Sequence, residues 1–100
     1  MMIAEKDWSI VTNDRDKAEL IINTILAMCD PGTVERKIIC KDSMTVLFSN
    51  GTRIRWYKPF LNALRGMKCS KLWCDKYVDE RLIDYIEACY FGEDKDVIWI

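Results

Sequence analysis

The pair Asn50-Gly51 lies between two short segments of strand-like composition, residues 44–49 (MTVLFS) and 52–57 (TRIRWY). Asn-Gly is a strong hairpin signal, because a two-residue type I′ turn needs positive φ at both of its central positions. The pair therefore predicts a β-hairpin, and a turn of this length places Leu47 opposite Ile54.

This predicted register gives the two faces of the hairpin different compositions. One face is suited to a core and carries Thr45, Leu47, Ile54 and Trp56. The other face mixes arginines with apolar and aromatic side chains, namely Arg53, Arg55, Met44, Val46, Phe48 and Tyr57. A surface of this kind is either covered by another part of the chain or offered to a partner.

Strand-like and helical patterns alternate around the hairpin. Apolar residues at helical spacing predict helices over residues 14–29, with Asn13 or Asp14 as N-cap, and over residues 79–91, with Asp79 as N-cap. Short helical turns are expected within residues 60–67, and further strands at 7–13, 35–41, 71–74 and 96–100, the last of them apolar enough for a sheet centre. The order predicts one α/β domain over residues 1–100, with a mixed sheet of about five to six strands and two main helices.

The apolar residues occur in short periodic runs, none of which reaches the ~18 residues of a membrane-spanning helix. The start of the chain lacks the apolar core of a signal peptide, which favours a cytoplasmic protein, in the host cell if the protein is viral. Five cysteines without framework spacing favour reduced thiols that pack as small apolar side chains; these are Cys29, Cys40, Cys69, Cys74 and Cys89.

Charge is strongly segregated along the chain. Residues 53–76 contain seven Lys or Arg and one acid, so this segment carries +6 while the remainder carries −7. Basic residues interleaved with aromatic ones predict a binding surface for an anionic partner. The candidate partner-binding residues are Arg53, Arg55, Trp56, Tyr57, Lys58, Arg65, Lys68 and Lys71.

Several kinds of catalytic site are excluded by composition. The chain has no histidine, which removes the commonest general base and most mixed zinc sites. Its four glycines are isolated, so no glycine-rich loop is available to hold phosphates. Cys69 and Cys74 lack a second closely spaced cysteine pair, and no acid–base pair can be named. The sequence therefore predicts a protein that is not an enzyme and that holds neither cofactor nor metal.

Residues 46–76 (VLFSNGTRIRW…LRGMKCSKLWCDK), together with the upstream SIVTNDRDKAELIINTIL, resemble part of the ATPase core of phage terminase large subunits and related P-loop packaging ATPases. The resemblance implies that Asp75 stands in the place of the Walker B aspartate, which orients magnesium, and Lys76 in that of the catalytic glutamate. A lysine cannot activate water as a carboxylate does, the strand before Asp75 carries Lys71, and no Walker A loop precedes Trp8. The resemblance thus implies a core without its nucleotide site.

The basic surface with its aromatic residues predicts a small binding protein, and the resemblance to terminases implies that it belongs to a phage or other mobile element. It would dock on a larger nucleic-acid-processing machine and modulate or inhibit it, as an anti-defence protein or a packaging accessory. The acidic helix over residues 79–87 could engage a basic groove of such a machine. The alternative is direct binding of DNA or RNA through residues 53–76, against which stand the net charge of −1 and a pI near 5.4.

Overall fold

The computed structural model describes residues 7–90 and 97–100. It confirms a small α/β domain with a six-stranded mixed sheet and three helices, two of them long. In chain order the elements are β1 Asp7–Val11, α1 Arg15–Ala27, a 3-10 turn at Pro31–Thr33, β2 Val34–Ile39, β3 Met44–Phe48, β4 Arg53–Tyr57, α2 Leu61–Leu64, β5 Lys71–Cys74, α3 Glu80–Cys89 and β6 Val97–Trp99.

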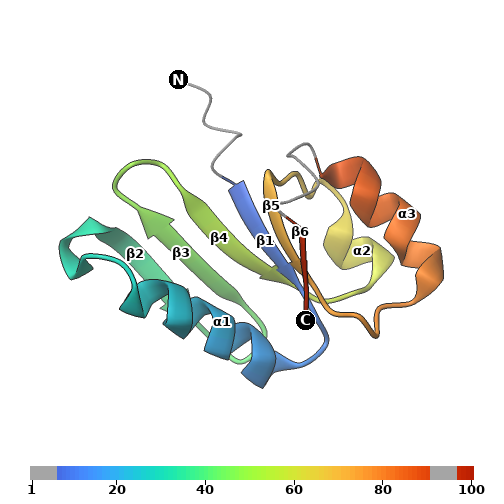
Figure 1. The fold of residues 1–100 in the computed structure, drawn as a ribbon, viewed down its shortest axis with the longest axis horizontal. Coiled ribbons are helices and arrows are strands. Elements are labelled where there is room, and N and C mark those ends of the chain that lie inside the picture. Colours follow the sequence, from blue (N-terminus) through green and yellow to red (C-terminus); the bar gives the residue numbers. More distant parts are fainter. Residues whose placement is uncertain (1–6, 91–96) are drawn as a thin grey trace.

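The sheet has the strand order β2-β3-β4-β1-β5-β6 (Figure 1). Strand β1 lies in the interior, parallel to both β4 and β5, and β6 is parallel to β5. Strands β2, β3 and β4 form an antiparallel meander. The expectation that the C-terminal strand lies in the centre of the sheet is wrong: β6 is the outermost described strand on its side, and Trp99 is 53% exposed.

Helices cover only half of each face of the sheet. Helix α1 packs over the meander, where Ala18 and Ile22 join the first core cluster with Val46, Ile54 and other buried side chains. Helices α2 and α3 lie on the opposite face, where Leu64 and Ile86 pack on strands β1 and β5 in the second cluster. Figure 1 shows α1 at one end of the sheet and α3 at the other. Two parts of the sheet therefore carry no described helix: strands β5 and β6 on the side of α1, and the meander on the side of α2 and α3.

Both long helices begin where the sequence predicts. The Asp14 carboxylate accepts hydrogen bonds from the backbone N–H groups of Asp16 and Lys17, at 3.0 and 3.2 Å, and the Asp79 carboxylate accepts one from Arg81 N–H at 2.9 Å. These caps satisfy N–H groups that have no partner within the helix. Helix α1 ends at Ala27, shortly before Pro31.

The hairpin exists, but its turn is one residue longer than predicted. Phe48 N–H donates to Thr52 O at 2.8 Å and Gly51 N–H donates to Phe48 O at 3.0 Å, so three residues form the loop. Gly51 has φ of +92°, and no non-glycine residue in the described part of the chain has positive φ. This is the pattern of a type I turn followed by a left-handed glycine, which suits hairpins as the two-residue turn does.

The longer turn shifts the register by one residue. Leu47 faces Arg53 and Val46 faces Ile54. Because side chains alternate between faces, the shift exchanges the two sides of β3 relative to the prediction. Met44, Val46 and Phe48 are buried under α1 together with Ile54 and Trp56, whereas Thr45 and Leu47 share the other face with the arginines.

Gly51→Ala tests this turn. The new methyl group would meet no atom within 4 Å, so the substitution acts through the positive φ alone. We expect the free energy of unfolding to fall by about 1–2 kcal/mol in urea denaturation, and by less in Gly51→Asn, because asparagine tolerates this conformation better. Equal stability of the alanine variant and the wild type would contradict the assigned turn.

Candidate functional site

Alternation along β4 places three of the predicted partner-binding residues on one face of the sheet. Arg53, Arg55 and Tyr57 point away from α1, while Ile54 and Trp56 point toward it. The pairing with β1 sets Arg53 beside Asp7 and Arg55 beside Ser9. Three functional groups of the hairpin are thereby brought together next to the central strand.

A small polar pocket of about 180 Å³ lies at this place. Its walls come from β1, β4 and the segment that follows α2. The lining residues are Asp7, Trp8, Ser9, Arg53, Arg55, Tyr57, Gly66 and Lys68. Four predicted partner-binding residues therefore surround one cavity: Arg53, Arg55 and Tyr57 come from β4, and Lys68 comes from the segment that follows α2.

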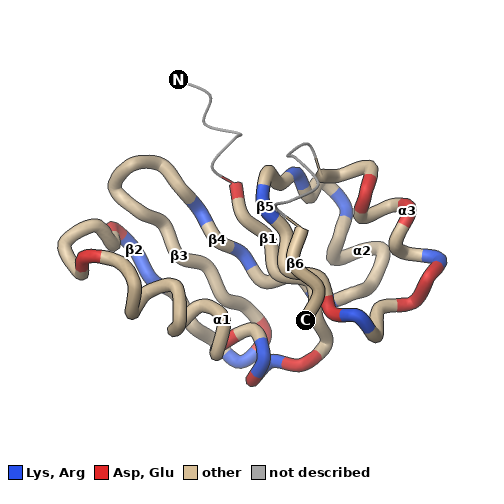
Figure 2. Tube along the Cα trace, viewed as in Figure 1, with Lys and Arg blue, Asp and Glu red and all other residues tan. Residues whose placement is uncertain are grey.

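The positive charge of the pocket is only partly neutralised. The Arg53 guanidinium lies 3.3 Å from the Asp7 carboxylate. Arg55 and Lys68 are exposed, and neither forms an ion pair with any residue in the described ranges 7–90 and 97–100. Figure 2 shows the cations along β4 and between α2 and β5, and acids along α3. Arg55 and Lys68 are thus two cations of the pocket that have no ion pair among the described residues and that can bind an anionic group.

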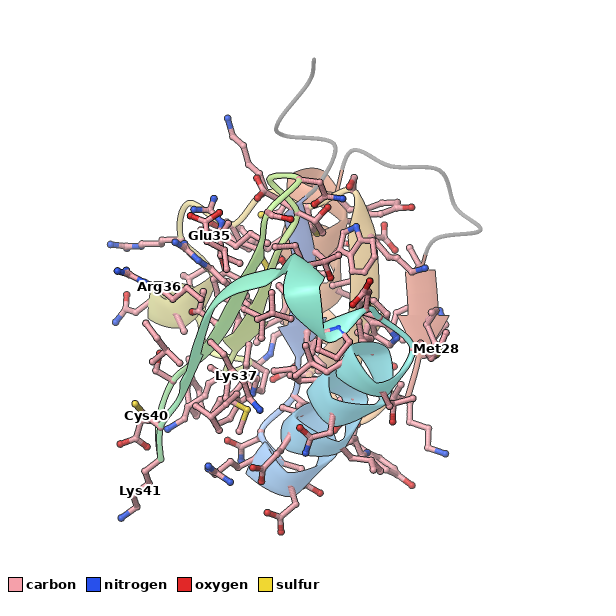
Figure 3. The ribbon with its side chains drawn as sticks, turned by 90° about the vertical axis from the view of Figure 1, so that its left-hand side faces the viewer. Met28, Glu35, Arg36, Lys37, Cys40 and Lys41 are labelled. Carbon is pink, nitrogen blue, oxygen red and sulfur yellow. The ribbon has the colours of Figure 1, made fainter. Side chains whose placement is uncertain are left out.

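The surface around the pocket extends across the meander. The strand pairing places Arg36 of β2 beside Leu47 of β3, and Leu47 beside Arg53 of β4. It likewise places Ile38 beside Thr45, and Thr45 beside Arg55. Figure 3 shows Arg36 on the side of the sheet away from α1. We call this surface the basic face; it consists of Arg36, Ile38, Thr45, Leu47, Arg53, Arg55, Tyr57 and Lys68.

Sequence reasoning missed Arg36 and Ile38 because the sequence gives no register between β2 and β3. The short connection at residues 40–43 contains no Asn-Gly pair that would have fixed it. Sequence reasoning placed Thr45 and Leu47 on the core face because it expected the shorter hairpin turn. The apolar residues that were expected on this face, Met44, Val46 and Phe48, are instead core residues.

The four other predicted partner-binding residues do not line the pocket. Trp56 is 8% exposed, and its indole N–H donates to Thr12 O at 2.8 Å, so this side chain belongs to the core. The Lys58 ammonium lies 5.7 Å from the Trp56 ring centroid and 3.1 Å from the Asp42 carboxylate. Lys71 lies beside Trp73 on the α1 side of the sheet. Arg65 is exposed next to Gly66 but does not line the pocket.

Asp75 directly follows β5 and is 7% exposed. Its carboxylate accepts hydrogen bonds from Thr12 Oγ1 at 2.6 Å, from Tyr77 N–H at 3.0 Å and from Lys17 Nζ at 3.4 Å. Burial raises the pKa of Asp75, but the hydrogen bonds from Thr12, Tyr77 and Lys17 together with the Lys17 charge outweigh this effect, so the pKa lies below its ordinary value. The carboxylate is fully engaged by the protein itself.

The position of Asp75 is nevertheless one where α/β proteins often bind ligands. The connections after β1 and β5 leave toward opposite faces of the sheet, and ligands favour the carboxyl ends of strands at such a switch point. Within residues 7–90 and 97–100, however, no three Cys, Asp or Glu side chains are grouped so that they could hold a metal ion. Lys76, the next residue, is exposed.

The buried cysteines behave as core residues. Cys69 and Cys74 lie in the second core cluster, and burial raises the pKa of each thiol to about 11. Thiols with such pKa values stay protonated near neutral pH and are poor nucleophiles and poor metal ligands.

Comparison with known proteins adds no relative. No protein-family model, no curated protein and no solved structure matches the chain. Within the described residues, no helix has the length and apolar character needed to cross a membrane. The resemblance to terminase ATPases remains a prediction from the sequence.

Proposed function

We propose that this protein is a small, non-enzymatic binding protein that docks through its basic face onto an acidic surface of a larger nucleic-acid-processing machine. The observation that carries the proposal is the pocket at which Arg53, Arg55, Tyr57 and Lys68 meet, with two of its cations unpaired among the described residues. A carboxylate-bearing side chain of the partner would enter this pocket and bind the free guanidinium of Arg55.

The composition of the basic face favours a protein partner over a nucleic acid. Arginine and tyrosine beside exposed aliphatic side chains such as Ile38 are typical of protein interfaces. A protein surface that binds nucleic acid makes several contacts with phosphate groups along the strand. The acidic side chains of α3 would repel such a long polyanion. Trp56, the aromatic side chain expected to stack or anchor, is buried.

The cellular setting of the proposal comes from the resemblance described above. It suggests a phage or mobile-element protein that acts in the host cytoplasm and modulates or inhibits the machine on which it docks. Anti-defence inhibitors and packaging accessories are the classes that fit. No cofactor is needed for such a role.

Charge reversal at the pocket tests the proposal. We expect Arg55→Glu with Lys68→Glu to abolish capture of the partners that the wild type retrieves from host lysate, as read by mass spectrometry, since reversal turns attraction into repulsion. Arg53 is left unchanged, because a glutamate there would lie beside Asp7 and disturb the fold. Lys37→Glu with Lys41→Glu is the matched control. Both residues, labelled in Figure 3, are exposed, carry the same charge change and do not line the pocket.

Unchanged capture by the pocket variant, or equal loss in both variants, would contradict docking through this face. Direct nucleic-acid binding predicts instead that the wild type shifts a labelled DNA or RNA at low salt, with affinity that falls steeply as salt rises. If the labelled nucleic acid shifts with the wild type and with the control but not with the pocket variant, the partner of the basic face is a nucleic acid and not a protein.

A further inference from the structure

A second surface lies on the opposite side of the sheet, between α1 and strands β5 and β6. It is an open groove of about 760 Å³. One wall is the flank of α1 with Leu20, Ile21 and Met28, and the floor is formed by Trp8 and Trp73 together with residues of the C-terminal strand, Ile98 and Ile100. Figure 3 shows Met28 on the side of the sheet that α1 occupies.

The groove is apolar and accessible. Met28 is 82% exposed, Leu20 67% and Ile98 38%. Strands β1, β5 and β6 are parallel to each other, and parallel strands are normally covered on both faces. Here α3 and its neighbours cover one face, whereas no helix within residues 7–90 and 97–100 covers β5 and β6 on the α1 side. In the part of the chain that the structure describes, this half of the sheet therefore has no cover on the α1 side, although parallel strands normally have one.

The size of the bare surface fits one helix. Adjacent strands lie about 4.8 Å apart, so two strands beside α1 offer a width of about 10 Å. Packed helices and their neighbours are separated by about 8–10 Å. A helix laid next to α1 would therefore fill the groove and contact both its aliphatic wall and its aromatic floor.

Among the described residues, the charged side chains that line this groove are Lys71 and Asp30, and Lys71 is the cation. Its ammonium lies 5.2 Å from the Trp8 ring centroid and 5.4 Å from that of Trp73, and no carboxylate among the described residues forms an ion pair with it. A cation held over two indole rings at the edge of an apolar surface complements a partner's carboxylate.

We propose that this groove binds an amphipathic α-helix of a protein partner. The apolar stripe of the helix packs on Leu20, Met28, Trp73 and Ile98, and an Asp or Glu beside the stripe pairs with Lys71. This is the helix-in-groove mode of recognition, with anchors spaced at i, i+3, i+4 and i+7. The groove and the basic face lie on opposite sides of the sheet, so both surfaces can be occupied at once.

A displayed library of helical peptides with apolar residues at this spacing and random polar residues elsewhere tests the proposal on the intact protein. We expect selection of peptides that bind, with an acid enriched at one position beside the stripe. Leu20→Glu with Met28→Glu should raise their Kd at least tenfold. Phe60→Glu with Leu61→Glu, two exposed apolar residues outside the groove, is the control and should leave Kd unchanged.

Lys71→Glu provides a second, independent readout. We expect this variant to bind the selected acidic peptides at least tenfold more weakly and to recover affinity for peptides in which the enriched acid is replaced by lysine. Recovery by charge exchange cannot result from simple unfolding of the variant.

Three results would overturn the proposal. Selected peptides that bind the groove variant and the control equally would place the helix elsewhere. A wild-type dimer in sedimentation that Met28→Glu converts to a monomer would identify a second copy as the occupant. Saturable binding of decanoate by the wild type, lost in Lys71→Glu, with no helical peptide selected, would identify an amphiphilic small molecule.

Discussion

Trp56→Ala is expected to lower the free energy of unfolding by about 3–5 kcal/mol, the range for large-to-small substitutions of buried aromatic residues. Trp56 is 8% exposed and lies in the first core cluster between the meander and α1. Its indole N–H donates to Thr12 O at 2.8 Å, and this backbone oxygen would lose its donor. The loss of volume and of the hydrogen bond act together at the centre of the domain.

Urea denaturation followed by circular dichroism measures this loss, and Trp56→Phe is the control. Phenylalanine retains most of the apolar volume but removes the N–H, so we expect a decrease of about 1–2 kcal/mol. If Trp56→Ala kept the stability of the wild type and lost only partner capture, Trp56 would be an interface anchor, as the sequence pattern alone predicted, and the buried position would be wrong.

The contrast between Trp56 and its neighbours shows how far the sequence could predict this protein. Periodicity and caps located the strands and both long helices, because burial patterns and capping chemistry are local. The hairpin was also predicted, yet Asn-Gly is compatible with both a two-residue and a three-residue loop. One residue of difference exchanged the faces of β3, so Val46 was expected outside and is buried.

The candidate site depended on the same non-local information. Arg53, Arg55 and Tyr57 were grouped correctly, since alternation within one strand is visible in the sequence. Lys71 was grouped with them by proximity in the sequence, but its strand directs it to the opposite face beside Trp73. The contribution of Arg36 requires the pairing of β2 with β3, which no residue pattern in this chain specifies.

Strand direction accounts for the different character of the two parts of the sheet that carry no described helix. The antiparallel strands β2 to β4 are covered on one side by α1, and their other side, the basic face, can be solvated because antiparallel sheets tolerate this. The bare part of the parallel half, beside α1, is apolar and forms the groove. The chain therefore presents one charged and one apolar surface on opposite sides of a thin sheet.

Asp75→Ala is expected to lower the free energy of unfolding by about 2–4 kcal/mol, because hydrogen bonds to a buried charged group are strong and their loss leaves the buried Thr12 hydroxyl without its acceptor. Thr12 Oγ1 and Tyr77 N–H would lose their acceptor. The Lys17 ammonium, whose side chain is 29% exposed, can turn to water and contributes less. The loss should appear in urea denaturation at about pH 7, well above the pKa of the carboxyl group.

Asp75→Asn separates the charge of this side chain from its shape. The pKa of Asp75 is lowered in the folded protein, so the stability that its charge contributes is present above the unfolded-state pKa and is lost as pH falls through the folded-state pKa. The stability difference between wild type and Asp75→Asn should therefore be largest near about pH 7 and shrink toward about pH 2. A carboxylate kept for a magnesium ion would be unpaired and strained in the metal-free protein, and its removal would stabilise the fold. If both substitutions lower the free energy of unfolding, and the loss becomes smaller as pH falls, Asp75 is a structural residue that joins β1, α1 and β5. If either substitution raises the free energy of unfolding, that result contradicts the structural role and favours a ligand site at the end of β5.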